Sequence, residues 1–203
     1  MTKEKFIEQL KKALNSHTVY ASGAFGASIG NFSSQLNRYY KNTLNKCGQN
    51  YADKVKKEAQ TKPCFAFDCC GLIKAILWNW NAKADDIYGG ADYESNGVPD
   101  TGAGASGLIS YCSDISTDFS KIEIGELLWL DGHVGVYIGD SKAIECTTAW
   151  SDNVLVSVVT NIRSAKSTEH GRKWTKHGKL PWVEYGKKLE IICPCCGAKF
   201  VKE

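Results

Sequence analysis

The chain has 203 residues, of which 43% are hydrophobic and 23% charged, and its formal net charge is +3. A length of about 100 to 200 residues is usual for one folded domain, so we expect a single active centre. The small net charge argues against nucleic-acid binding, which usually needs a concentrated basic stripe. No apolar run approaches the roughly 20 residues that span a bilayer, which argues against membrane insertion.

The N-terminus and the cysteine content predict where the protein is made. The first residues alternate charged and apolar side chains and lack the apolar core, about 7 to 15 residues long, of a secretory signal. We therefore expect synthesis in the cytoplasm. The nine cysteines are expected to be reduced thiols rather than a disulfide framework, and their odd number leaves one unpaired in any case.

Two helical patterns in the first half of the chain are separated by a glycine-rich segment. Apolar residues at helical spacing in residues 3–15 predict an amphipathic opening helix. Residues 19–34 are rich in glycine and serine, which is typical of a tightly bending loop, and a weakly helical stretch follows to about residue 60. Apolar positions in residues 71–80 predict a helix with a buried face, for which Asp68 stands at the N-cap.

The second half is predicted to be mainly β-structure. Residues 82–120 have a loop composition, interrupted by a short helix at residues 107–112. An antiparallel arrangement is predicted next, because short turn sequences separate four strand patterns, at residues 127–131, 133–138, 143–147 and 153–160. Pro181 predicts that residues 174–185 form a final loop and an edge strand.

Cys69 is the first candidate for chemistry, because it directly follows the N-cap residue Asp68. At a helix N-terminus a thiolate faces the positive end of the helix dipole and unpaired backbone N–H groups, which lower a thiol pKa. The same N–H groups could form an oxyanion hole. Taken alone, Cys69 is more simply interpreted as a structural thiol, since cysteine is among the most buried residue types.

His133 and Glu145 favour a catalytic role for Cys69 over a structural one. His133 and Gly135 alternate with apolar residues that take the core, so they share the other face, where the glycine leaves room for a substrate or a helix. A catalytic base also needs an orienting partner. With an odd-numbered loop between the strands, Glu145 pairs opposite Gly135 and lies diagonal to His133. An even-numbered loop puts Cys146 there instead, and the sequence leaves both registers open. Taken alone, Glu145 is about equally well interpreted as a surface carboxylate.

Two strings, FDCCGLIKAILW and GELLWLDGHVGVYIGD, with Glu145 twelve positions after His133, resemble the motifs of the NlpC/p-sixty cell-wall cysteine peptidases. With WTKHGKLPWVEY and VYASGAFG added, the chain is most similar to phage endolysin-type members. The resemblance covers roughly residues 1–186. It implies a papain-like α+β fold, in which N-terminal helices include a nucleophile helix packed on an antiparallel β-sheet.

The same resemblance implies roles for individual residues. Cys69 would be the nucleophile, His133 the base that later acts as acid, and Glu145 the orienting residue. Tyr20 and Asp68 would bind substrate. The implied reaction is cleavage of an amide bond in a peptidoglycan stem peptide, typically between D-isoglutamate and the following diamino acid, with no cofactor for catalysis. Some relatives are instead N-acetylmuramoyl-L-alanine amidases.

This sequence departs from the family pattern at two positions. Cys70 stands where serine is usual and adds a rival thiol, although the order Asp-Cys-x-Gly favours Cys69 as nucleophile. Glu145 replaces the more frequent His, Asn or Gln, and a carboxylate there should raise the pKa of His133.

Three functions follow as hypotheses. The first is a bacteriolytic phage or mobile-element lysin that reaches the wall through a holin-type route, since no export signal is seen. The second is a catalytically silent wall-binding module, for which a Glu145 turned away from His133 would be the mark. The third is an acyltransferase, against which the order of cysteine before histidine counts.

Residues 187–203 differ in composition and are predicted to be a separate cysteine-rich tail. Cys193 and Cys196 have the spacing with which two thiolates bind one ion, so the tail resembles half of a zinc ribbon. A closed structural zinc site needs two more ligands. Candidates are a second copy of the tail, Cys47, Cys64 and Cys112.

Overall fold

The computed structural model describes residues 1–186 with their side chains and the backbone of two further strands, β11 (Leu189–Ile192) and β12 (Lys199–Lys202). These two strands pair with each other in antiparallel orientation. Cys193 and Cys196, the predicted half zinc site, lie outside the described residues. Within the described parts of the chain, no helix combines the length and the apolar character that crossing a membrane requires.

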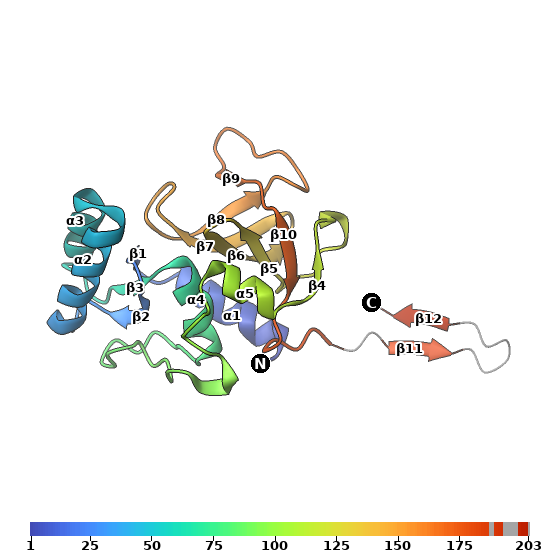
Figure 1. The fold of residues 1–203 in the computed structure, drawn as a ribbon, viewed down its shortest axis with the longest axis horizontal. Coiled ribbons are helices and arrows are strands. Elements are labelled where there is room, and N and C mark those ends of the chain that lie inside the picture. The colour runs from blue at the N-terminus through green and yellow to red at the C-terminus, as the bar shows by residue number, and fades with distance from the viewer. Residues whose placement is uncertain (187–188, 193–198, 203) are drawn as a thin grey trace.

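Three helices, α1 (Lys3–Leu14), α4 (Cys69–Leu77) and α5 (Ala105–Tyr111), pack against one large sheet (Figure 1). They confirm the three helices expected near these positions. Every residue of α4 is buried, and Asp68 caps it by accepting the Gly71 N–H at 2.6 Å. The helix ends three residues before the predicted limit, where Asn79 takes a left-handed φ of 67°.

Two antiparallel helices occupy the stretch for which the sequence pattern was weakly helical. They are α2 (Ser33–Cys47) and α3 (Gln49–Glu58), and they pack closely on each other. Gly48 joins them with a φ of 94°, a conformation that favours glycine. In Figure 1 this pair lies at the left-hand end of the molecule.

A small three-stranded sheet corrects the prediction of a loop in residues 19–34. Its order is β1-β3-β2, formed by β1 (Thr18–Tyr20), β2 (Phe25–Ser28) and β3 (Phe65–Phe67). These strands are three or four residues long, and almost all of their residues are buried. They therefore show no alternation of polar and apolar side chains, and glycine and serine dominate the local composition.

The large sheet has the order β4-β10-β5-β6-β7-β8-β9. Its middle is the predicted antiparallel meander, which together with the helices makes the α+β fold class correct. A strand at residues 113–116 was not predicted, since that region has a loop composition. The bounds are β4 (Ser113–Ser116), β5 (Leu127–Leu130), β6 (His133–Gly139), β7 (Lys142–Thr147), β8 (Asn153–Val159), β9 (Gly171–Arg172) and β10 (Lys176–Lys179).

Strand β10 is not the edge strand that Pro181 predicted. It pairs with β5 on one side and with β4 on the other, so its backbone is bonded on both sides. Pro181 lies beyond its last residue, Lys179, and therefore removes no donor from the ladder.

The register of β6 and β7 places Glu145 on the face of His133. Val136 pairs with Ile144, which sets Gly135 opposite Glu145. The turn at Asp140 and Ser141 has positive φ at both residues, as a tight hairpin requires. A bulge between Tyr137 and Gly139 shifts the pairing by one residue and so selects this register over the alternative that the sequence left open.

The space beside Gly135 is filled, contrary to the expectation of room for a substrate or a helix. A Cβ at this position would lie 2.9 Å from the ring of Trp174 and 3.3 Å from the Cβ of Glu145. Trp174 comes from the loop between β9 and β10 and is almost completely buried. The glycine therefore serves the close approach of an indole that belongs to the protein itself.

A substitution at Gly71 tests how closely α4, the helix that begins at Cys69, packs against the backbone at Ala24. Its Cβ would lie 1.9 Å from the carbonyl oxygen of Ala24, a clash that backbone must move to relieve. We expect Gly71→Ala to lower the free energy of unfolding by about 3 kcal/mol or more in chemical denaturation. The matched control is Gly104→Ala, whose Cβ has no atom within 4 Å and which should change stability by less than about 1 kcal/mol. Equal effects would contradict this packing.

Candidate active site

Cys69 is the first residue of α4 and is 9% exposed. The capping residue Asp68 accepts the N–H of Gly71 through its side chain and that of Leu72 through its carbonyl. Among the described residues, the N–H groups of Cys69 and Cys70 have no hydrogen-bond acceptor. This helix end therefore presents two free donors beside a thiol, an arrangement suited to an oxyanion.

His133 begins β6 and connects Cys69 to Glu145. Its Nε2 lies 2.6 Å from Oε2 of Glu145, which leaves Nδ1 as the ring nitrogen for the thiol. The indole of Trp174 stacks on the imidazole at 5.6 Å between centroids, with 12° between the ring planes. The ring is thus held by a hydrogen bond at one edge and by an aromatic face on one side.

The charges of this group favour a thiolate beside an imidazolium. The hydrogen bond from Cys70 lowers the pKa of Cys69 well below its usual value, and His133 adds to this effect against the opposing influence of burial. The hydrogen bond to Cys69 and burial raise the pKa of Cys70 far above that of a free thiol. For His133, burial lowers the pKa, but the hydrogen bonds to Cys69 and Glu145 outweigh it and raise the pKa overall.

Two neighbours of Glu145 were not found from the sequence. Its carboxylate is fully buried and accepts hydrogen bonds from the Ser157 hydroxyl and from Nε of Arg172, which lies 2.7 Å from Oε2. Although burial opposes ionisation, His133, Arg172 and Ser157 together hold the pKa of Glu145 below its usual range. A lone serine among valines on β8 was a weak signal for Ser157. Arg172 gave none, because a long loop separates it from β8.

Arg172 is itself held in place by contacts beyond Glu145. Its guanidinium lies 4.6 Å from the ring centroid of Trp150, and Nη2 donates to the Thr147 hydroxyl at 3.1 Å. The side chain is therefore oriented by an aromatic face and a second acceptor. It forms a fixed cation behind the carboxylate.

Asp68 directly precedes Cys69, and Tyr20 is close enough for the charge of Cys69 to raise its pKa. Asp68 also shapes the fold. Its two carboxylate oxygens accept the N–H groups of Gly71 and Gly23, the latter at 2.8 Å. Burial, together with the negative charge of Cys69, raises the pKa of Asp68 to about 6. Burial and the negative charges of Asp68 and Cys69 raise the pKa of Tyr20. A role in substrate binding stays a prediction for both residues.

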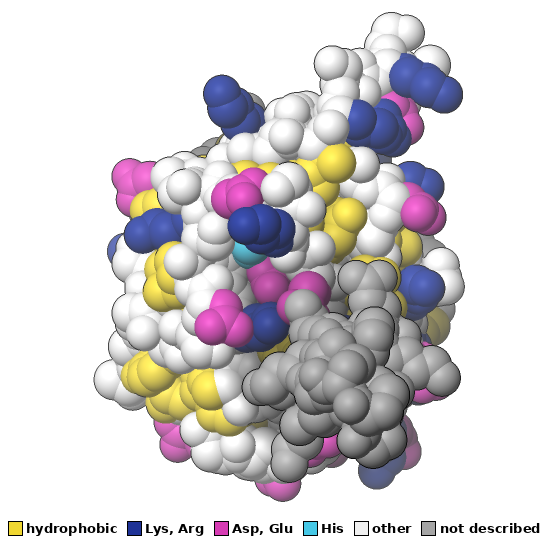
Figure 2. All heavy atoms as spheres, turned by 90° about the vertical axis from the view of Figure 1, so that its right-hand side faces the viewer, with side chains coloured by type: hydrophobic (Ala, Val, Ile, Leu, Met, Phe, Trp, Pro, Cys, Tyr) yellow, Lys and Arg dark blue, Asp and Glu magenta, His cyan; other side chains and the backbone are white. Residues whose placement is uncertain are grey.

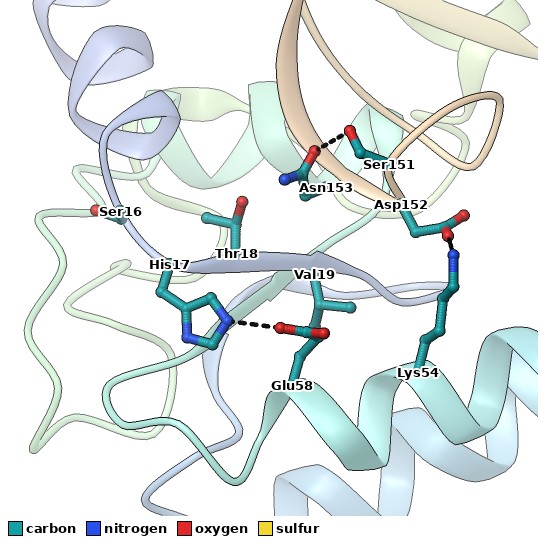
Figure 3. Close-up of a pocket in the computed structure, with 9 residues that line it drawn as sticks. All are labelled: Ser16, His17, Thr18, Val19, Lys54, Glu58, Ser151, Asp152 and Asn153. Atoms are coloured by element: carbon teal, nitrogen blue, oxygen red, sulfur yellow. Dashed lines mark hydrogen bonds and ion pairs between the residues drawn. The ribbon is translucent and has the colours of Figure 1, made fainter.

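A polar pocket of about 280 Å³ lies along β1 and contains none of the predicted site residues. Figure 3 shows that its side chains mostly pair with one another. The pairs are His17 with Glu58, Lys54 with Asp152, and Ser151 with Asn153. The pocket lies close to Tyr20, because the backbone N–H of Tyr20 donates to the carbonyl of Asp152, which lines the pocket, at 2.6 Å.

A second histidine–carboxylate pair, His177 with Glu126, lies in the large sheet and is almost fully buried. The remaining ring nitrogen of His177 lies 3.2 Å from the Asp118 carbonyl oxygen. Lys179 pairs with Asp114 and Glu123. Figure 2 shows basic and acidic side chains close to one another near the middle of one face of the molecule. Because both ring nitrogens of His177 are engaged by the protein, neither is free to act as a catalytic base.

No protein-family model and no curated protein sequence matches the chain. Among solved structures, the peptidoglycan hydrolase RipB from Mycobacterium tuberculosis matches with a TM-score of 0.44 and 16% identity, over 90% of this chain and 65% of that one. The p-sixty domain of an antigen from M. avium subspecies paratuberculosis matches with a TM-score of 0.44 and 18% identity, over 90% and 96%. The chain thus spans less than two thirds of the RipB chain.

The contact between His133 and Glu145 predicts how the pKa of His133 changes when Glu145 is replaced. Glu145→Gln removes the negative charge that helps to raise the pKa of His133, although the amide oxygen can still accept a hydrogen bond from Nε2, so that pKa should fall. NMR titration of the His133 imidazole measures the change, with Glu123→Gln, a carboxylate paired with Lys179, as the matched control. An unchanged or higher pKa of His133 in Glu145→Gln would contradict the site as described.

Proposed function

We propose that this chain is a cysteine-type hydrolase of the NlpC/p-sixty family that cleaves an amide bond in a peptidoglycan stem peptide. The observation that carries the proposal is the alignment of Cys69, His133 and Glu145. Three different elements bring them together, and the lowered thiol pKa and the raised imidazole pKa favour a reactive ion pair. This arrangement is what nucleophilic acyl transfer through a thiol needs.

The chemistry follows from these positions. The Cys69 thiolate attacks the carbonyl carbon of the amide, and the N–H groups of Cys69 and Cys70 are placed to stabilise the oxyanion. His133, protonated on Nδ1, gives its proton to the leaving amine, and a thioester to Cys69 remains. Water then attacks the thioester while His133 takes a proton from it, which releases the acid and restores the thiolate of Cys69 beside the protonated His133. Glu145 keeps the imidazole oriented through Nε2.

The choice of substrate rests on the motifs around the site. The FDCCG and HVGVY strings carry the resemblance to wall peptidases. They contain Cys69 and His133, two of the three residues of the candidate site. On this basis we propose the bond between D-isoglutamate and the diamino acid as the substrate bond, with the muramoyl-L-alanine amide as the other target. We further propose a lysin of phage or mobile-element origin, with residues 1–186 as its catalytic domain and the cysteine tail apart from it.

The hypothesis of a silent wall-binding module loses its main support. It depended on Glu145 turning away from His133, whereas their side chains lie 2.6 Å apart. Arg172 and Ser157 moreover hold the carboxylate ionised in this position.

Muropeptide digestion tests the proposed activity directly. Wild-type protein incubated with purified muropeptides should give new fragments, because Cys69 supplies the attacking thiolate. Cys69→Ala should give none, a loss of at least about 10⁴-fold in rate. Mass spectrometry of the products identifies the bond cut. Cys47→Ala is the matched control, since this free thiol lies at the end of α2, and it should behave as wild type. Cleavage that persists in Cys69→Ala would refute the assignment of the nucleophile.

The pH dependence of cleavage should be bell-shaped. On the acid side kcat/KM falls as the Cys69 thiolate is protonated, below its lowered pKa. On the alkaline side it falls as His133 loses the proton that the leaving amine needs, above its raised pKa. In Glu145→Gln the alkaline limb should move to lower pH, because the pKa of His133 decreases. A profile whose alkaline limb does not move would show that Glu145 does not act on the base.

A further inference from the structure

Cys70 is a buried thiol whose sulfur forms and breaks no covalent bond in the proposed reaction, although it is hydrogen-bonded to Cys69. Its Sγ lies 3.8 Å from Sγ of the nucleophile Cys69. Two thiolates bound at about 2.3 Å to one tetrahedral ion are themselves about 3.8 Å apart. The two sulfur atoms therefore already have the separation that a single zinc-like ion imposes.

Further ligands stand beside the two sulfurs. A carboxylate oxygen of Asp68 and both Sγ atoms lie within 4.8 Å of one another. His133 is hydrogen-bonded to Cys69, and its Nε2 is engaged by Glu145, which leaves Nδ1 as the nitrogen for the thiol. A carboxylate behind a coordinating imidazole is also the usual outer partner of a zinc-bound histidine.

We propose that Cys69 and Cys70 form a dithiol site for one thiophilic divalent ion of the zinc class, completed by His133 or Asp68. Sulfur ligands select Zn²⁺ or Cd²⁺ over Mg²⁺ and Ca²⁺, which prefer oxygen. Binding converts the thiol–thiolate pair and the ion into a dithiolate complex and releases the Cys70 proton to solvent. Where His133 is the further ligand, the proton on its Nδ1 is released as well. The same sulfur cannot then attack an amide, so the ion is an inhibitor of the hydrolase.

The binding half of this inference stands on geometry alone, whereas the inhibitory half rests on the proposed function. The two halves therefore need separate measurements. Cys70→Ser is the sharpest variant, because a hydroxyl still donates a hydrogen bond to Cys69 but is a poor ligand for a soft ion. Cys112→Ser is the matched control, since Cys112 is a free buried thiol on a different element.

The first measurement is titration of the full-length protein with Cd²⁺ alone, followed through the ultraviolet thiolate-to-cadmium charge-transfer band. Cysteines elsewhere in the chain are the same in wild type and Cys70→Ser, so the difference between these two proteins reports on the site. We expect wild type and Cys112→Ser to bind one Cd²⁺ more per chain than Cys70→Ser and Cys69→Ser. Equal stoichiometry in wild type and Cys70→Ser would overturn the proposal.

A measurement on the wild-type protein covers the case in which a variant fails to fold. Peptide mapping after alkylation should show Cys69 labelled in metal-free protein and protected by stoichiometric Cd²⁺, while Cys47 is labelled in both samples. Labelling of Cys69 that Cd²⁺ does not change would also overturn the proposal.

Inhibition is then measured on muropeptide cleavage. Zn²⁺ should inhibit wild type reversibly, with recovery on addition of a chelator, and Cys70→Ser should need at least about tenfold more Zn²⁺ for half inhibition of its own activity. If no protein cleaves muropeptides, the proposed function fails while the cadmium titration still decides the site. If cleavage is as sensitive to Zn²⁺ in Cys70→Ser as in wild type, the inhibitory role of Cys70 is refuted.

Discussion

The buried charge of Glu145 is the constraint around which this site is arranged. A carboxylate without solvent costs several kcal/mol unless its neighbours neutralise it and fill its hydrogen bonds. Here the neighbours come from three strands: His133 from β6, Ser157 from β8 and Arg172 from β9. Because each contact is needed to keep the charge buried, the pairing of these strands and the orientation of the imidazole depend on one another.

Much of the fold could be predicted because its main elements carry local signals. The helices α1 and α4 have apolar faces at helical spacing, and β5 to β8 are separated by turn sequences. The failures have a common cause. Strands β1 and β2 are so short and buried that they show no alternation, and the neighbours of β10 come from distant parts of the chain. Pairing with distant segments leaves no trace in a local pattern.

The residues of the candidate site fall into the same two groups, those that a local pattern marks and those that distant segments position. Cys69 and His133 could be located because a helix start and a strand alternation mark them. The position of Glu145 depended on one bulge in the β6–β7 hairpin; without it, Glu145 would stand opposite Val136, toward the apolar side of the sheet. Arg172 reaches the carboxylate after a loop of about ten residues whose course no periodicity describes.

The indole of Trp174 has a consequence for the order of events in the proposed reaction. Stacked on His133 and wedged beside Gly135, it blocks rotation of the imidazole, and Glu145 occupies the far nitrogen. One ring nitrogen in one orientation must therefore serve both the departing amine and the incoming water. The two occupy the same place in turn, so the first product has to leave before hydrolysis of the acyl-enzyme can begin.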